Sequence, residues 1–387
     1  TYTLSGTLSA GQIAVDLGDG AEEDPEAVVT IVLDGVDITC TVAPAIIFYR
    51  VYECGSADME TATQTVDTSA AGANVVIADG TENRVTGSHV AKIYKPESVT
   101  LNADGTAVEE AKKLHKYDGA LYSKMSMNVS GGEAGTGTLE IVADNEGLDS
   151  ELHLTINSGN IHILAGNDGI NTNEDGVSVT TINGGTLRIE VTGETGEGDG
   201  IDSNGWLVIN GGMVIAAACS DSADSGLDSD NGIYINGGIV IASGNIYDAV
   251  DGGDQTYAVF QFAQKQSGGQ TYTLKNAAGE TILEMTPENA FQYLVVSAPG
   301  LAEGEYTLWC GDTQLGASTG SVGGPSGGMG RPDGQPPEGA PGQKPEGADD
   351  GQQPPEPPAD GQRPEGGPNG AMDRSEERRV GKECRSR

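Results

Sequence analysis

A short motif that recurs four times at nearly constant spacing constrains the fold more than any other feature. Each copy reads Ile-Asn-Gly-Gly or Ile-Asn-Ser-Gly, and successive asparagines lie 26, 27 and 26 residues apart. These asparagines are Asn157, Asn183, Asn210 and Asn236. A fixed period of this length is typical of repeat proteins whose units stack along one axis.

Apolar residues two positions apart flank each motif, which is the spacing of a β-strand. The strand predicted before the asparagine ends in Ile156, Ile182, Ile209 or Ile235. The strand predicted after it contributes Ile161 and Ile163, Leu187 and Ile189, Val214 and Ala216, or Val240 and Ala242. Two short strands with their turns in about 26 residues describe one coil of a parallel β-helix. Helical repeats are the competing class, but apolar spacing of two and a glycine turn in every unit argue against them.

Composition supports an all-β chain, because 59 glycines and only four phenylalanines favour strands joined by many turns. We expect a parallel β-helix solenoid over residues 1–254, with the clearest repeats in 118–254. The stretch 45–72 does not repeat, and we interpret it as an insertion or an irregular coil. Residues 255–319 have strand-like alternation of apolar and polar side chains, interrupted by Gly and Pro turns. We therefore expect a small antiparallel β cap there, which covers the open strand edges at the end of the stack.

Two segments at the end of the chain have a different texture. Residues 320–373 are dense in Pro and Gly with almost no aliphatic side chains, which predicts a disordered tail. The last fourteen residues, "RSEERRVGKECRSR" (374–387), resemble the in-frame translation of a widely used DNA-sequencing adapter. We interpret them as an assembly artefact, the alternative being a genuine basic tail.

The net charge of −38 excludes some partners and favours others. A surface this acidic repels nucleic acid and anionic lipid and attracts cations. No apolar run approaches the roughly 20 residues that span a bilayer, so no membrane insertion is expected. The chain begins at Thr1 without a signal segment, and we expect a mature product or a fragment of a secreted or cell-surface protein.

The cysteines and histidines give no zinc pattern. Cys40, Cys54, Cys219 and Cys310 show no CxxC spacing, and the four histidines are scattered along the chain. Cys40 and Cys54 could form a disulfide in a secreted protein, or the thiols could be free and buried in a β core.

An acidic turn precedes the first strand of each repeat, as in "GDGIDSNGWLVINGG" (198–212). One set of equivalent positions follows Gly-Leu or Gly-Ile, and a second set lies before that glycine. The eight residues are Asp149, Asn171, Asp202 and Asp228, and Glu146, Asp168, Asp199 and Asp224. Since the aliphatic residue points into the core, the next side chain is expected to point outward.

Stacking these acids places like charges about 4.8 Å apart, where they repel by roughly 0.9 kcal/mol per pair even in water. A divalent cation relieves the conflict, and the all-oxygen surroundings favour Ca²⁺ over zinc. The simpler alternative is that Asp-Gly only makes turns. The stacked asparagines, by contrast, predict a structural ladder of side-chain amides.

The strings "GLDSELHLTINSG", "DGIDSNGWLVINGG" and "GLDSDNGIYINGG", followed by "GGQTYTLKNAAGETILEMTP", resemble the secreted carbohydrate-binding domain family whose founding member binds acidic pectic polysaccharide. The resemblance covers about residues 1–320. It implies a calcium-binding, right-handed parallel β-helix similar to a pectate lyase, without established lyase activity. It also implies that the eight residues of the acidic turns bind the metal.

Three functions remain open at this point. The first is non-catalytic, Ca²⁺-dependent binding of an acidic, polygalacturonate-like polysaccharide, in which Trp206, Tyr234 and Tyr247 could stack on sugars or simply pack under the cap. The second is a Ca²⁺-dependent polysaccharide lyase with Arg188 as its base, or Arg188 could be an ordinary surface residue. The third is a structural surface adhesin with stabilising calcium.

Overall fold

The computed structural model describes residues 1–90, 94–111 and 117–322. All the described residues belong to one compact unit, Thr1–Pro332. Residues 333–387 lie outside the described residues. The predicted artefact at 374–387 and nearly all of the predicted tail lie there too.

The prediction of an all-β chain is confirmed. The described residues form strands and two 3₁₀ turns, η1 (Ala21–Glu23) and η2 (Pro96–Ser98), with no α-helix among them. No helix in this part of the chain could cross a membrane.

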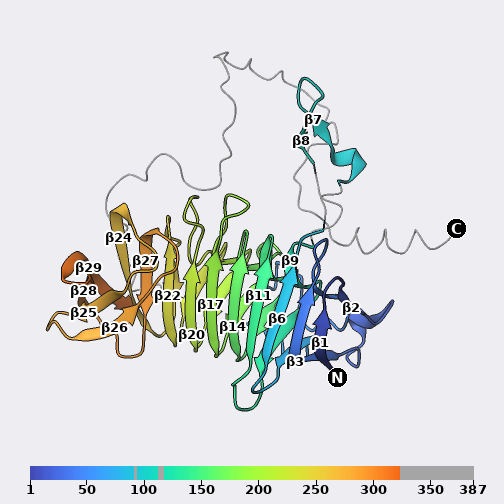
Figure 1. Ribbon diagram of the computed structural model, residues 1–387, viewed down its shortest axis with the longest axis horizontal. Coiled ribbons are helices and arrows are strands. Elements are labelled where there is room, and N and C mark those ends of the chain that lie inside the picture. Colours follow the sequence, from blue (N-terminus) through green and yellow to red (C-terminus); the bar gives the residue numbers. More distant parts are fainter. Residues whose placement is uncertain (91–93, 112–116, 323–387) are drawn as a thin grey trace, which may run out of the picture. The chain divides into compact units, whose positions relative to one another are not determined.

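Most strands belong to three ladders in which each strand pairs in parallel with the equivalent strand of the next repeat (Figure 1). The first ladder holds β5 (Ala73–Ile77), β10 (Met127–Gly131), β13 (Leu154–Ile156), β16 (Val179–Ile182), β19 (Trp206–Ile209), β21 (Gly232–Ile235) and β23 (Val250–Gly252). The second holds β6 (Glu82–Gly87), β11 (Thr138–Ala143), β14 (Asn160–Ala165), β17 (Thr186–Val191), β20 (Met213–Ala217) and β22 (Ile239–Gly244). The third holds β2 (Ile13–Asp16), β4 (Ile46–Arg50), β9 (Gly119–Ser123), β12 (Glu146–Ser150), β15 (Ile170–Thr172) and β18 (Ile201–Ser203).

The N-terminal residues join the same ladders. The long strand β3 (Val29–Thr39) pairs with β1 (Tyr2–Leu8), with β5 of the first ladder and with β6 of the second. A separate antiparallel pair, β7 (Thr100–Leu101) and β8 (Val108–Glu110), lies in the part of the sequence between the first repeats. The weaker repetition predicted for residues 1–117 therefore corresponds to real parallel pairing in β3, β5 and β6.

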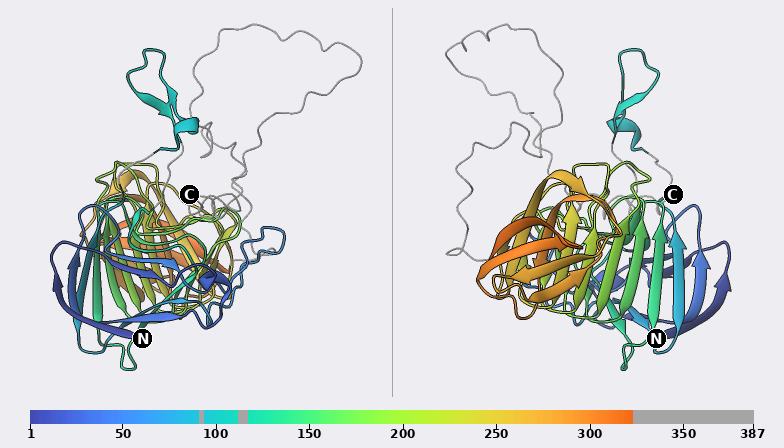
Figure 2. Two further views of the ribbon diagram at one scale, coloured as in Figure 1. Left: turned by 90° about the vertical axis from the view of Figure 1, so that its right-hand side faces the viewer. Right: turned by 60° about the vertical axis from the view of Figure 1, so that its left-hand side comes forward.

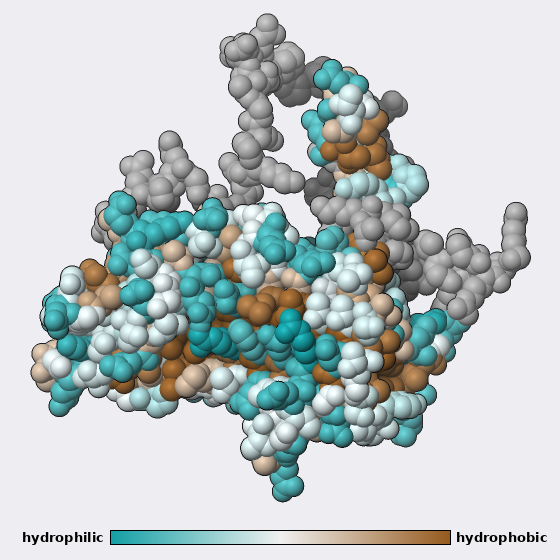
Figure 3. All heavy atoms as spheres, in the orientation of Figure 1, coloured by the Kyte–Doolittle hydropathy of each residue, from teal (hydrophilic) through white to brown (hydrophobic). Residues whose placement is uncertain are grey.

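The residues predicted to point inward are buried between the ladders. Ile182, Ile209 and Ile235 of the first ladder and Ile163 and Ile189 of the second are at most 1% exposed and share one continuous core. Burying such a side chain contributes about 1.5 to 3 kcal/mol. The outward positions of the second ladder alternate with them and carry Arg84, Glu140, His162 and Arg188 side by side. Figure 3 shows this face, where a hydrophilic band crosses the strands.

Residues 256–322 form antiparallel strands. They are β24 (Thr256–Gln266), β25 (Tyr272–Asn276), β26 (Thr281–Met285), β27 (Phe291–Ser297), β28 (Gly304–Cys310) and β29 (Thr313–Val322). β27 pairs antiparallel with β22, so these strands continue the second ladder at its end (Figure 2). They lie in the same compact unit as the repeats, and the boundary at residue 254 stays a prediction.

The start of the predicted tail at residue 320 falls inside a strand. Ser321 and Val322 at the end of β29 pair with Tyr257 and Thr256 of β24, and these backbone hydrogen bonds extend the strand past the first Gly-rich residues.

The antiparallel strands cover three of the four apolar side chains at the outward positions of β20 and β22. Ile241 is buried with Phe260 and Phe291, and Ile215 and Ile239 pack against the same cluster. The fourth, Met213, stays 37% exposed. The reason is geometric, because β27 pairs with β22 only from Val240 onward and ends before it reaches the start of β20.

The four cysteines of the described chain, Cys40, Cys54, Cys219 and Cys310, are free thiols, and Cys40 and Cys219 are buried. Of the two alternatives left open by the sequence, the structure contains the free thiols.

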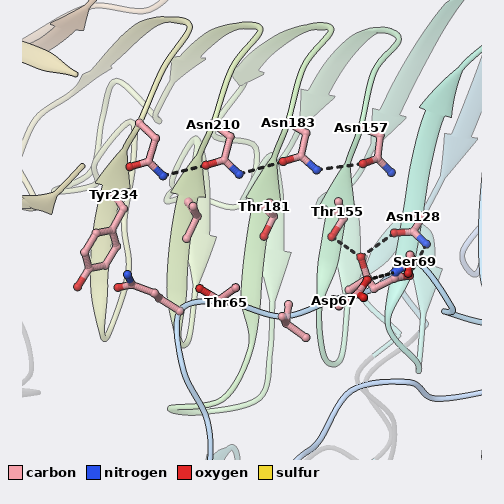
Figure 4. A pocket seen from close by; sticks show the side chains of 15 residues that line it. Thr65, Asp67, Ser69, Asn128, Thr155, Asn157, Thr181, Asn183, Asn210 and Tyr234 are labelled. Atoms are coloured by element: carbon pink, nitrogen blue, oxygen red, sulfur yellow. Dashed lines mark hydrogen bonds between the residues drawn. The ribbon is translucent and has the colours of Figure 1, made fainter. Parts of the chain in front are cut away.

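The predicted amide ladder is present at the turn between the first and second ladders. The side-chain N–H of Asn183 donates to Oδ1 of Asn157 at 3.0 Å, Asn210 donates to Asn183 at 2.9 Å, and Asn236 donates to Asn210 at 2.8 Å. Figure 4 shows the three bonds in one line. Each bond joins two consecutive coils at the same corner.

We predict that Asn210→Ala lowers the free energy of unfolding about twice as much as Asn236→Ala. Asn210 takes part in two bonds of the ladder and Asn236 in one, and each such bond contributes about 0.5 to 1.5 kcal/mol. Urea unfolding monitored by circular dichroism measures both variants, and equal losses would contradict a contribution from each bond of the ladder.

Candidate functional site

The eight predicted acidic-turn residues, called the acidic row below, lie at consecutive positions along and beside the third ladder. Asp149 of β12, Asn171 of β15 and Asp202 of β18 are neighbours in register. A bridge between Ile201 and Leu227 places Asp228 next in the row. The alignment read from the sequence is therefore the alignment in the structure.

A glycine in every turn allows this close stacking. A Cβ on Gly169 would lie 2.1 Å from Cγ2 of Ile189 and 2.6 Å from the carbonyl oxygen of Gly200. Gly147 and Gly200 meet the same obstacles in their own coils. The Asp-Gly-Ile-Asp pattern thus has glycine because the next coil passes directly above it.

The predicted outward exposure of the row is wrong for its first members. Asp149 is 0% exposed and Asn171 is 8% exposed. Asp149 lies beside Tyr122 in register, and its Oδ1 accepts a hydrogen bond from Asn173 at 2.7 Å. The side chains of neighbouring coils cover these positions, an effect that the alternation of a single strand does not reveal.

Four acids converge on a hollow of about 180 Å³. Asp168, Asp199 and Asp224 line it together with Glu197 and Asn167. The last two were not predicted, because Glu197 lies in a turn of irregular length and has no counterpart in the other repeats. A cluster of Asp, Glu and Gly in "GETGEGDG" (193–200) was the available signal.

Backbone amides of adjacent coils hold these carboxylates in place. Oδ1 of Asp168 accepts from the N–H of Asp199 at 2.7 Å, and Oδ1 of Asp199 accepts from the N–H of Ser225 at 2.6 Å. Oδ2 of Asp224 accepts from the N–H of Gly198 at 2.6 Å. Each of the three carboxylates uses one oxygen in this way, so these acids also tie the coils together.

Burial and mutual repulsion raise the pKa values along the row. Burial, followed by the nearby charge of Glu146, raises the pKa of Asp168 to about 8. Burial and the charge of Asp168 raise the pKa of Asp199 to about 9 and that of Asp202 to about 8. The pKa of Asp149 lies well above its ordinary value for the same two reasons, with Glu146 as the nearest charge. Full ionisation of the row would therefore place more negative charge there than its surroundings stabilise.

The donor set suits a hard cation. Every side chain that lines the hollow carries oxygen. Elsewhere in the row, outside the hollow, the buried Oδ2 of Asp149 and Oδ1 of Asn171 accept no hydrogen bond from any described residue. Oxygen ligands of this kind suit Ca²⁺. In the described part of the chain, however, no three His, Cys, Asp or Glu side chains are already arranged as a metal site. A cation here would draw on Asn and backbone oxygens as well as on the acids.

A second concave site lies on the first ladder and was not predicted. The strap, defined as residues 64–69, crosses the outward face of the first ladder and encloses a groove of about 380 Å³ (Figure 4). Thr68 of the strap donates to Oδ1 of Asn128 at 2.9 Å and shares a hydrogen bond with the hydroxyl of Thr155 at 2.7 Å. The strap is part of the stretch 45–72, which was only recognised as non-repeating.

The three aromatic candidates have different surroundings. Tyr234 lines the groove. Tyr247 stacks on Tyr293 of β27 with ring centroids 6.3 Å apart, which places it in the packing alternative. Trp206 lies half-buried at the start of β19 and lines neither concave site.

Arg188, the candidate base of a lyase, lies on the second ladder and not on the third. Its guanidinium forms an ion pair with Glu288, in the turn before β27. The alternative of an ordinary structural residue accounts for this contact.

Comparison with known proteins places the chain in a family. Residues 1–259 match the family model for carbohydrate-binding domain-containing proteins, and the chain belongs to that family. A solved structure, that of the polysaccharide lyase-like protein from C. thermocellum in a gadolinium derivative, is similar at 23% identity with a TM-score of 0.35. The match covers 61% of this chain and 79% of that one. No curated protein matches.

His153, which lies under the stretch 45–72, gives a pH prediction. It is 3% exposed, its Nδ1 accepts from the N–H of Val179 at 3.1 Å, and burial lowers its pKa to about 4. The unfolded chain takes up this proton near pH 6.5 and the folded chain only near pH 4. His153 therefore destabilises the fold as the pH falls from 6.5 to 4, by up to about 3 kcal/mol.

The acids with raised pKa values stabilise the fold as the pH falls, which opposes the effect of His153. The contribution of His153 is therefore measured as the difference between the wild type and a variant that lacks the histidine. His153→Asn keeps an acceptor for Val179 and removes the titration. We expect the stability difference between this variant and the wild type to shift in favour of the variant between pH 7 and pH 4.5, measured by urea unfolding in EDTA. A difference that is constant with pH would contradict the buried neutral histidine.

Proposed function

We propose that this protein binds an acidic, polygalacturonate-like polysaccharide through Ca²⁺ held at the acidic row, without cleaving it. The main observation behind this proposal is the hollow where Asp168, Asp199, Asp224 and Glu197 converge. A strongly acidic protein repels a polyanion, and a divalent cation between the two removes that repulsion. Membership of the carbohydrate-binding family supports the polysaccharide as partner.

The three parallel ladders support a finer description of the fold. In this proposal they are the three faces of a right-handed parallel β-helix, and the strands at 256–322 are its cap. The acidic row then follows one edge of the helix, and a glycan chain lying along that edge passes the hollow lined by Asp168, Asp199 and Asp224. Such a domain acts outside the cell or at its surface, where the polymer is found.

The residues of the row would contribute to cation binding in two ways, either by lining the hollow or by extending the row on either side of it. Asp168, Asp199 and Asp224 face the hollow with carboxylates that adjacent backbone amides already orient. Glu146, Asp149, Asn171, Asp202 and Asp228 continue the row on either side, with Asn171 donating to Oε1 of Glu146 at 3.1 Å. The bound cation supplies positive charge that a uronate carboxylate can share.

Removal of one ligand tests the calcium site. We expect Asp199→Asn to weaken Ca²⁺ binding about tenfold or more, because a carboxylate facing the hollow is replaced by a neutral amide. Calorimetric titration of Ca²⁺ and then of oligogalacturonate into the full chain measures both steps. Asp34→Asn, at an exposed acid of β3 outside the row, removes the same charge and should titrate like the wild type. Equal calcium affinity in Asp199→Asn and Asp34→Asn would overturn the site.

The binding function predicts an absence of turnover. With Arg188 paired to Glu288 and placed on a different ladder from the row, no unsaturated product should accumulate from polygalacturonate with Ca²⁺, as followed by ultraviolet absorbance. Turnover that disappears in Arg188→Ala would favour the lyase. A large calcium-dependent rise in melting temperature with no glycan retained would favour the adhesin.

A further inference from the structure

The groove under the strap is lined by side chains that follow one another along the stacking direction. Five outward positions of the first ladder are neighbours in register, and they are Asn128, Thr155, Thr181, Val208 and Tyr234. The amide ladder borders the same groove. Because successive coils lie about 4.8 Å apart, the groove repeats its chemistry at a distance close to the length of one sugar unit in an extended polysaccharide.

The amide ladder keeps hydrogen-bonding capacity for a ligand. The four asparagines are exposed, and each bond of the ladder uses only one of the two N–H groups of a side chain. In the described part of the chain no second partner is found for the amide nitrogens of Asn183 and Asn210. The remaining N–H groups and the hydroxyl of Thr181 suit the many hydroxyls of a sugar chain.

The strap is fastened at one end of the groove and open at the other. Near Asn128 and Thr155 it is held by the side-chain bonds of Thr68, and the carbonyl of Thr68 also accepts from the amide of Asn128 at 2.8 Å. No hydrogen bond among the described residues joins it to Thr181 or Tyr234. Figure 4 shows Thr65 of the strap facing the strands across this open part.

The charge of the groove differs from that of the acidic row. Asp67 is its one charged lining residue, and no Lys or Arg faces it. A polyanion would find no cation there and no cluster of acids that could gather Ca²⁺. The tyrosine ring of Tyr234, half-buried at the open end, provides an apolar face of the kind that packs on a pyranose ring.

We infer that the groove is a second glycan site, which holds one extended chain of neutral hexopyranose units with one unit per coil and does not need calcium. This inference depends on the proposed function in one respect, namely that the ligand is a polysaccharide. The amides of Asn183 and Asn210 would contact the sugar hydroxyls, Tyr234 would pack on one ring, and the strap would cover the chain from the opposite side.

The test uses the full chain in EDTA, with cellohexaose, mannohexaose and β-1,4-galactohexaose as probes in separate calorimetric titrations. We expect at least one probe to bind, and Thr181→Trp, which places a large ring in the groove, to weaken it about tenfold or more. The matched control is Thr186→Trp at the exposed start of β17 in the same coil, which should bind like the wild type. Thermal melting verifies that both variants are folded, and Tyr234→Ala serves as a second groove variant.

The inference is overturned if no probe binds in EDTA, or if both Thr181→Trp and Tyr234→Ala bind as tightly as the wild type. A parallel titration of Ca²⁺ and oligogalacturonate separates the two sites. Thr181→Trp should keep that binding, whereas Asp199→Asn should lose it and still bind the neutral probe. Loss of both ligands in the same variant would contradict two independent sites.

Discussion

Parallel pairing in register, with a spacing of about 4.8 Å between coils, is the constraint from which the other features follow. Each position of one coil lies directly above the same position of the next, as Asp149, Asn171 and Asp202 do in the third ladder. No Cβ fits where the next coil passes directly above the backbone, and this explains the glycines at 169 and 200. Any residue type that recurs at one position is therefore multiplied into a row.

Whether such a row stabilises the fold depends on whether its side chains attract or repel one another. Neutral amides carry both a donor and an acceptor, so the row from Asn157 to Asn236 stabilises itself by hydrogen bonds. Carboxylates in the same arrangement repel one another, and burial adds to the cost, as the raised pKa values of Asp168 and Asp199 show. The amide row can serve structure unaided, whereas the acidic row needs protons or a cation.

This difference also explains what could be predicted from the sequence. The strand positions of Ile182 and Ile209, the ladder of asparagines and the alignment of Asp202 with Asn171 all follow from the period, because stacking copies local order along the axis. Non-repeating residues have no such guide. The contribution of Glu197 to the hollow and the docking of Thr68 on Asn128 depend on loops whose path the period does not determine. The burial of Asp149 required knowledge of the neighbouring coils.

In the two proposals, one repeat supports two kinds of recognition at its two concave sites. The acidic row and the groove belong to different ladders of the same coils, and each presents its functional group once per coil. A polymer with a similar repeat can therefore make the same contact several times, and contacts that are weak singly add along the chain. In this scheme, specificity lies in which position of the repeat faces the polymer: carboxylates at Asp199 and Asp202 would require a cation, whereas amides at Asn183 and Asn210 would contact a neutral chain directly. A non-repeating segment such as the strap matters because it turns a flat strand face into a groove. In the proposal, this groove is what makes the amide row a binding site.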